Sequence, residues 1–312
     1  MLLAAVNPDP TNFSIPYLRG ILTTNRESRP MTITKSISLG DLEFDYRVCG
    51  DEKDELVVFL HGFPETSIMW TELMPEIAAL GFYCIAPDMR GYSKNACPKG
   101  ASNYTIEKIS NDILGIADTL KPGKFHLVGH DWGAAIGWDI TYNHRERILS
   151  WTSLSVPHSR AFATALKEDK EQKKMSRYIG LFLIPMLPEL IVRRNDFKAF
   201  RKLWKHSTPE VLENYLSVFR RKKSLTGALN YYRANFRQGR QPIRDVEAPT
   251  LFIWGNRDFA IGAFGAHKTQ DYMKGEYTFL EVDGGHWLVQ SNYPEVKVAL
   301  SKHLTTHKTL PD

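Results

Sequence analysis

The chain has 312 residues, of which 43% are hydrophobic and 24% are charged, and its formal net charge is +5 at pH 7. This length suits one elaborated domain with a substantial core and an inserted lobe. The composition, with ordinary glycine and proline usage, excludes a disordered, collagen-like or fibrous chain.

Cysteine usage and the amino terminus bear on the compartment. Three cysteines without C-x-x-C spacing indicate neither a disulfide framework nor a zinc site. No stretch approaches the roughly 18 apolar residues of a membrane span, and the start MLLAAVNPDP lacks the basic region of a signal peptide. We therefore expect a cytoplasmic protein without a bound metal. Residues 1–30 show no clear periodicity and are expected to form an N-terminal arm.

Short apolar strands alternate with amphipathic helices along the rest of the chain, which predicts βα units around a mostly parallel sheet. The continuous apolar runs of the middle strands are typical of a sheet that helices cover on both faces. Strands are expected at residues 33–38, 42–48, 56–60, 82–87, 125–129, 148–155, 250–255 and 277–282. Covering helices are expected at residues 67–79, 105–120, 133–144 and 293–306.

A stretch of different character separates the sixth strand from the seventh. Residues 157–245 are helical in pattern and carry 20 Lys or Arg against 8 Asp or Glu, a net of +12, whereas the remainder carries 20 against 27, a net of −7. We expect an inserted helical lobe between two core segments, 31–156 and 246–312. Its basic surplus is either a solvated exterior or a surface that associates weakly with an anionic membrane or partner. No nucleic-acid-binding motif accompanies the charge, so no nucleic-acid partner is expected.

The strongest local signal is the segment Gly129-His130-Asp131-Trp132-Gly133, which lies between a predicted strand and a predicted helix. The pattern is the nucleophile elbow G-x-S-x-G with Asp in place of Ser, and small residues at its ends permit the tight turn. An Asp at this place is also a common helix N-cap. The assignment of Asp131 as a nucleophile therefore depends on the other signals.

A second signal, His61-Gly62-Phe63-Pro64, follows the strand at 56–60, at the sheet edge where α/β proteins bind ligands. Such a loop helps to form an oxyanion hole, in which the backbone N–H groups of Phe63 and Trp132 would converge on one oxygen. We expect His61 to be a structural histidine that bonds within the loop, and Pro64 to follow a cis peptide bond.

Asp258 and His286 each follow a predicted strand. The order nucleophile, acid, histidine along the chain is that of α/β-hydrolases. Taken singly, a loop Asp is usually a turn residue and a lone His is usually structural. Together with the elbow at Asp131, they predict a catalytic triad.

These motifs resemble those of the epoxide hydrolase branch of the α/β-hydrolase superfamily, over roughly residues 40–305. The resemblance implies an eight-stranded, mostly parallel sheet flanked by helices, with the inserted lobe as a helical cap and no cofactor. The segments that carry it are HGFPETSIMW at 61–70, DMRGYS at 88–93, GHDWG at 129–133, WGNRD at 254–258, GGHW at 284–287, IPMLPE at 184–189, NDF at 195–197 and ALNYYR at 228–233.

The resemblance also assigns roles in the cap. Tyr232 corresponds to a tyrosine that protonates the leaving oxygen, and Tyr231 is its aromatic neighbour. A second cap tyrosine of the family aligns with Leu181 here, and we take Tyr178, one helical turn earlier, as its replacement. The expected reaction joins water to a small apolar epoxide.

These residue types suit the opening of an epoxide through an ester intermediate. A carboxylate attacks a saturated carbon that bears a leaving group and forms an alkyl ester. An epoxide leaves as an alkoxide, which requires a positioned acid such as Tyr232. His286, oriented by Asp258, would then activate the water that hydrolyses the ester on Asp131.

Two alternatives stay open. Dehalogenases share the fold and the Asp nucleophile. In the loop at residues 61–64, however, haloalkane dehalogenases have Asn at the position of Phe63, and at the elbow haloacetate dehalogenases have Arg at the position of Trp132. The other alternative is a hydrolase-like binding protein without catalysis, for which an intact set of nucleophile, acid and base would be unnecessary.

Overall fold

The computed structural model describes residues 30–205, 207–236 and 243–309. The expected N-terminal arm, residues 1–30, lies outside the described residues except for its last position.

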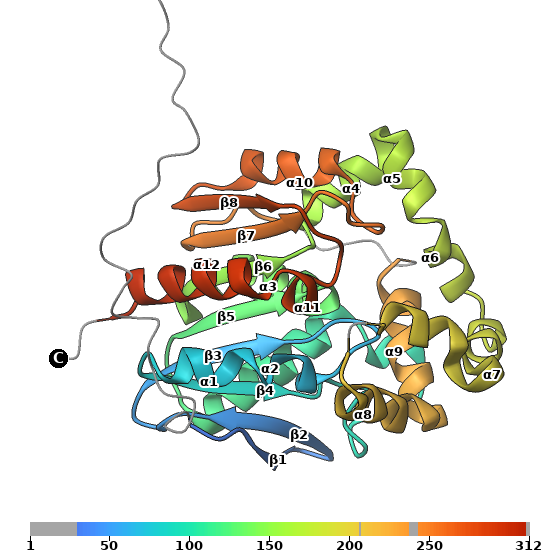
Figure 1. Cartoon of the computed structure of the whole chain (residues 1–312), viewed down its shortest axis with the longest axis horizontal. Coiled ribbons are helices and arrows are strands. Elements are labelled where there is room, and N and C mark those ends of the chain that lie inside the picture. Colours follow the sequence, from blue (N-terminus) through green and yellow to red (C-terminus); the bar gives the residue numbers. More distant parts are fainter. Residues whose placement is uncertain (1–29, 206, 237–242, 310–312) are drawn as a thin grey trace, which may run out of the picture.

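An eight-stranded sheet forms the centre of the molecule (Figure 1). The order across it is β1-β2-β4-β3-β5-β6-β7-β8; β2 pairs antiparallel with β1 and β4, and all other neighbours are parallel. This confirms the predicted mostly parallel sheet, and each strand agrees with its predicted range to within one residue. The strands are β1 (Ile33–Leu39), β2 (Leu42–Cys49), β3 (Glu55–Leu60), β4 (Phe82–Pro87), β5 (Phe125–His130), β6 (Ile148–Leu154), β7 (Thr250–Gly255) and β8 (Tyr277–Val282).

Helices cover both faces of the sheet. Since side chains alternate along each buried strand, successive residues of one strand pack against helices on opposite faces. Val57 and Phe59 of β3 pack in one buried cluster with α1 (Leu73–Ala78) and α12 (Tyr293–Thr306). Their neighbours Val58 and Leu60 join the opposite cluster, with α2 (Ile106–Leu120) and α3 (Trp132–Asn143).

The predicted helix at 67–79 is two shorter pieces, the 3₁₀ helix η3 (Ser67–Trp70) and α1. Pro75 explains the break, because proline has no N–H and is tolerated only in the first turn of a helix. The second helix therefore starts at Leu73, so that Pro75 falls in its first turn.

The stretch 157–245 forms a series of helices, as its pattern predicts. The first of them packs on the core beside α10 (Ala263–Lys268), whereas the last four lie beyond the carboxyl ends of the parallel strands (Figure 1). The placing of the core–cap boundary at residue 157 stays a prediction. The helices are α4 (Ser159–Glu168), α5 (Lys170–Met175), α6 (Arg177–Phe182), α7 (Leu187–Leu203), α8 (Pro209–Arg220) and α9 (Lys222–Asn235).

Within the described ranges no single helix is long and apolar enough to cross a membrane; the sharply bent pair Lys170–Phe182 and Leu187–Leu203 passes that test by length and composition alone.

Candidate active site

The turn at Asp131 joins β5 directly to α3. Asp131 has φ 52° and ψ −117°, a sparsely populated conformation for a residue with a side chain. The surrounding backbone leaves no room for larger residues: a Cβ at Gly129 would lie 2.5 Å from the carbonyl oxygen of Gly133, and one at Gly133 would lie 2.2 Å from that of Leu60. The glycines of the elbow are thus required by close packing, and the strained turn projects the Asp131 side chain from the sheet edge.

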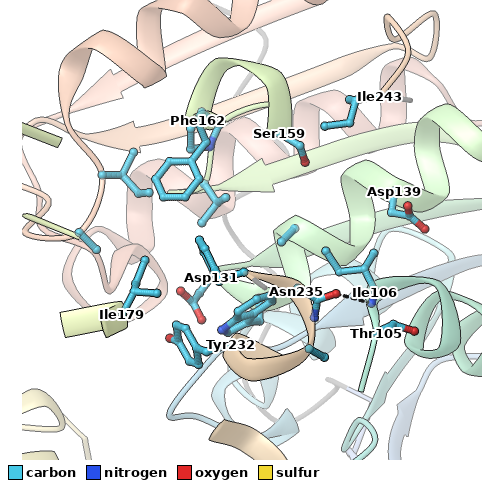
Figure 2. A pocket seen from close by; sticks show the side chains of 18 of the residues that line it. Thr105, Ile106, Asp131, Asp139, Ser159, Phe162, Ile179, Tyr232, Asn235 and Ile243 are labelled. Carbon is cyan, nitrogen blue, oxygen red and sulfur yellow. Dashed lines mark hydrogen bonds between the residues drawn. The ribbon is translucent and has the colours of Figure 1, made fainter. Parts of the chain in front are cut away.

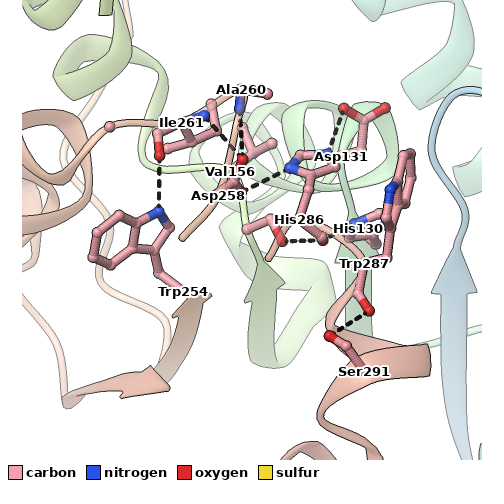
Figure 3. Close-up of polar contacts among 12 residues, drawn as sticks. His130, Asp131, Val156, Trp254, Asp258, Ala260, Ile261, His286, Trp287 and Ser291 are labelled. Carbon is pink, nitrogen blue, oxygen red and sulfur yellow. Dashed lines mark hydrogen bonds and ion pairs between the residues drawn. The ribbon is translucent and has the colours of Figure 1, made fainter. Parts of the chain in front are cut away.

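The structure brings together Asp131, His286 and Asp258 (Figure 3). His286 Nδ1 lies 2.7 Å from Asp258 Oδ2, and its Nε2 lies 3.3 Å from Asp131 Oδ2. The other oxygen of Asp258 accepts the N–H groups of Ala260 and Ile261 at 2.7 and 3.1 Å. Asp258 is therefore fixed in its own loop and holds the imidazole toward Asp131.

The loop at residues 61–64 lies against Asp131. The backbone N–H of Phe63 donates to Asp131 Oδ1 at 2.7 Å, and the peptide bond between Phe63 and Pro64 is cis. His61 bonds to Gly62 O through Nδ1 and accepts the N–H of Met89 at Nε2, both at 3.1 Å. His61 thus braces the loop. The N–H of Trp132 belongs to the first residue of α3, where helical N–H groups have no partner within the helix.

Asp131 and His286 line a cavity of about 230 Å³, together with Tyr178 and Tyr232 of the cap. Figure 2 shows Asp131 and Tyr232 close together in this cavity. The rings of the two tyrosines are 6.3 Å apart and nearly perpendicular. Tyr231 points elsewhere, since its hydroxyl donates to the carbonyl oxygen of Arg90 at 2.8 Å. The cavity thus brings together the expected nucleophile, base and both expected acids, while Asp258 stands behind His286.

The walls of the cavity are largely apolar. Ile179 and Phe236 come from the cap, and Val156 and Ile261 come from the core. Asp139 lies at the end away from Asp131 (Figure 2). Other cap aromatics, Phe182 and Phe219 among them, pack edge-on around Phe63 instead.

The electrostatics of the triad are strongly coupled. Burial raises the pKa of Asp131, but the hydrogen bond and the charge of His286 outweigh it and hold the pKa below its ordinary value. Burial lowers the pKa of His286, whereas the charge of Asp258 and the hydrogen bond to Asp131 raise it, to about 10. Both pKa shifts favour the charged pair, a carboxylate on Asp131 beside a protonated His286.

The two cap tyrosines stay protonated. Burial, followed by the charge of Asp131, raises the pKa of Tyr178; burial, followed by Tyr178 and Asp131, raises that of Tyr232. Both hydroxyls are thus available as hydrogen-bond donors at neutral pH.

Sequence reasoning missed Glu65, which is buried behind the triad. Its Oε1 accepts bonds from the Tyr215 hydroxyl at 3.1 Å and from Gln290 Nε2 at 2.7 Å, and its Oε2 lies 3.5 Å from His130 Nδ1. Burial raises the pKa of Glu65 to about 8, and burial, with nearby His286, lowers that of His130 to about 4. The only signal in the sequence was an acidic residue directly after His61-Gly62-Phe63-Pro64.

Among the described residues, no group of three or more His, Cys, Asp or Glu side chains is placed to hold a metal ion.

Comparisons with known proteins agree with this geometry. The profile of a family described as alpha/beta hydrolase fold matches residues 55–292. Epoxide hydrolase 3 of Xenopus tropicalis is 30% identical over 95% of this chain and 87% of its own length. Epoxide hydrolase 4 of Homo sapiens is 32% identical over 82% of this chain and 73% of its own. A crystal structure of an epoxide hydrolase from Bacillus megaterium in complex with an inhibitor has a TM-score of 0.80 at 26% identity, covering 87% of this chain and all of that one.

Proposed function

The chain belongs to the epoxide hydrolase branch of the α/β-hydrolase family, and we propose that it converts an epoxide into a vicinal diol in two steps, through an alkyl ester on Asp131. The observation that carries the proposal is the cavity, whose lining brings the carboxylate of Asp131 together with Tyr178 and Tyr232 of the cap.

In the first step, Asp131 Oδ2 attacks an epoxide carbon, since Oδ1 already accepts the N–H of Phe63. The carbon–oxygen bond of the epoxide breaks as the ester bond forms. Tyr232 donates its proton to the leaving alkoxide, and Tyr178 donates a hydrogen bond to the same oxygen. Positioned acids of this kind typically contribute about 10²–10⁴ in rate.

In the second step, His286 takes a proton from a water that attacks the carbonyl carbon of the ester. Esterification removes the negative charge of Asp131, which is one of the causes of the raised pKa of His286. The imidazolium thereby becomes able to pass its proton, through solvent, to the phenolate that Tyr232 became in the first step, and the neutral imidazole acts as the base.

The oxyanion forms on Oδ1, where the N–H groups of Phe63 and Trp132 stabilise it. When it collapses, the bond between the acyl carbon and the ester oxygen breaks, and the diol leaves with the proton that His286 took from the water. The second proton of the water passes from Asp131 to His286, which restores the resting site.

The direct test is turnover on a panel of aryl and alkyl epoxides beside matched alkyl halides. We expect diol from epoxides and no halide release. Halide release without turnover of any epoxide would contradict the proposal and favour a dehalogenase, and binding without turnover would favour a binding protein.

The apolar walls support an apolar substrate, and we propose that the enzyme works in a reducing compartment such as the cytoplasm, since Cys49, Cys84 and Cys97 are all unpaired. We also propose that the basic cap has a weak affinity for anionic membranes.

A further inference from the structure

The cap carries a concentrated patch of exposed aliphatic side chains, which we define as the cap tip, residues 184–191. Five of the ten exposed large hydrophobic side chains in the described part of the chain lie within these eight residues. Met186 and Leu190 are 74% and 69% exposed. The other three are Ile184, Leu187 and Ile191. Clustered exposed apolar residues of this kind mark an interaction site.

The cap tip is held in place at its base, so its exposure does not reflect a loose loop. Arg233, which is only 8% exposed, pairs with both carboxylate oxygens of Glu189 at 2.8 and 2.9 Å. The same guanidinium donates to the carbonyl oxygens of Phe182 and Ile184 at 3.1 and 2.8 Å. One buried side chain thus clamps both ends of the tip and leaves its apolar residues outward.

The charge around the tip has one sign. Residues 177–205 contain seven Lys or Arg against two Asp or Glu, a net of +5. Both acids are already neutralised, Glu189 by Arg233 and Asp196 by Arg201 and Arg220. Six cations have no ion-pair partner in the described part of the chain: Arg177, Arg193, Arg194, Lys198, Lys202 and Lys205. Among them, Arg193 donates to the carbonyl oxygens of Phe219 and Arg220.

We propose that the cap tip inserts into the surface of an anionic phospholipid bilayer, with the unpaired cations of residues 177–205 beside the lipid phosphates. Aliphatic side chains beside Lys and Arg are the combination that interfacial binding requires, because apolar burial and attraction to anionic lipid add together. A two-fold contact between two tips fits less well, since it would bring two basic caps together. Figure 1 shows α7 at the end of the molecule away from the sheet, where a flat surface can reach it.

This proposal rests on the proposed membrane affinity of the cap and assigns it to one segment, the cap tip. The tip follows directly on α6, whose Tyr178 and Ile179 line the cavity, and its clamp Arg233 follows Tyr232 on α9. If the proposed function holds, an apolar epoxide that partitions into lipid meets the enzyme on the lobe that carries its acids.

The test is co-sedimentation of the full chain with phosphatidylcholine vesicles that contain phosphatidylserine, beside vesicles of phosphatidylcholine alone. We compare the wild type with the double variant Met186→Asp/Leu190→Asp. The matched control is Val298→Asp, which replaces a 49% exposed aliphatic residue of α12, a helix that packs on the sheet and does not belong to the cap. Circular dichroism and thermal unfolding check that each variant is folded.

We expect the wild type and the control to bind the anionic vesicles at low salt, and to bind them less at physiological salt, where the Debye length is about 8 Å. The tip variant should bind these vesicles at least roughly tenfold more weakly than the wild type. Lys198→Glu/Lys202→Glu should weaken binding to anionic vesicles as well.

Absence of wild-type binding at low salt, or equal binding by the tip variant, would overturn the proposal. A wild-type dimer that the tip variant dissociates would assign the patch to a second copy instead. Sedimentation is read without turnover, so failure of the proposed catalysis would leave this result intact, and the reverse holds as well.

Discussion

The backbone N–H of Phe63 donates to Oδ1 of Asp131 at 2.7 Å, so one carboxylate oxygen already lies at the position proposed for the oxyanion. The loop that carries Phe63 approaches Asp131 closely, since a Cβ at Gly62 would lie 2.3 Å from the Cβ of Asp131.

Gly62→Ala should therefore displace the N–H of Phe63 and lower kcat by about 10²-fold or more, the usual effect of losing one oxyanion donor. Gly180→Ala is the matched control, since a Cβ at Gly180 meets nothing within 4 Å. It should keep full activity and gain about 0.5–1 kcal/mol of helix stability. Equal activity in both variants would remove the Phe63 N–H from the mechanism.

Tyr232→Phe should slow ester formation by roughly tenfold or more, because the nascent alkoxide loses its proton donor. Tyr231→Phe is the neighbouring control on the same helix. It deletes only a bond to the carbonyl oxygen of Arg90, so we expect a loss of about 1 kcal/mol in the free energy of unfolding and an unchanged alkylation rate. Pre-steady-state kinetics separates the two outcomes, and an unchanged rate in Tyr232→Phe would exclude Tyr232 as the acid.

Tyr178→Phe tests whether the second tyrosine shares this role. Both rings line the cavity beside Asp131, so each single variant should retain measurable alkylation and the double variant should lose nearly all of it. If Tyr178→Phe matches the wild type and the double variant matches Tyr232→Phe, then Tyr178 only shapes the cavity.

Glu65 predicts a specific dependence of stability on pH. Burial raises its pKa in the folded protein to about 8, above its value in the unfolded chain. Its contribution to stability is therefore full below the unfolded pKa, near 4.5, and is lost as the pH rises toward 8. Relative to Glu65→Gln, the wild type should lose up to about 1.4 kcal/mol of unfolding free energy per pH unit across that window. Urea denaturation of both proteins measures the difference, and parallel pH profiles would contradict the buried, uncharged state of Glu65.

The sequence predicts the three residues of the triad because each lies just after the end of a strand. Asp131, Asp258 and His286 each follow an apolar strand, and parallel strands bring their carboxyl ends to one edge, so their proximity follows from local pattern. Helix 293–306 is likewise read correctly from its periodicity, whereas Pro75 divides the helix predicted at 67–79.

Other features depend on contacts between distant segments. Glu65 is buried because Tyr215 of α8 and Gln290 of α11 (Leu288–Ser291) close over it, and neither contact has a local signature. The outward face of the cap tip likewise depends on Arg233, more than 40 residues away from Glu189 along the chain.

The covalent intermediate on Asp131 is the centre of the account, and intact-mass spectrometry of His286→Gln after mixing with an epoxide tests it most directly. This variant lacks the base for the second step, so the protein should gain the mass of one substrate molecule, and peptide mapping should place the added mass on Asp131. The same variant with Asp131→Ala should gain nothing. No adduct on His286→Gln despite turnover of the epoxide by the wild type, or an adduct that persists without Asp131, would contradict the proposed nucleophile and base.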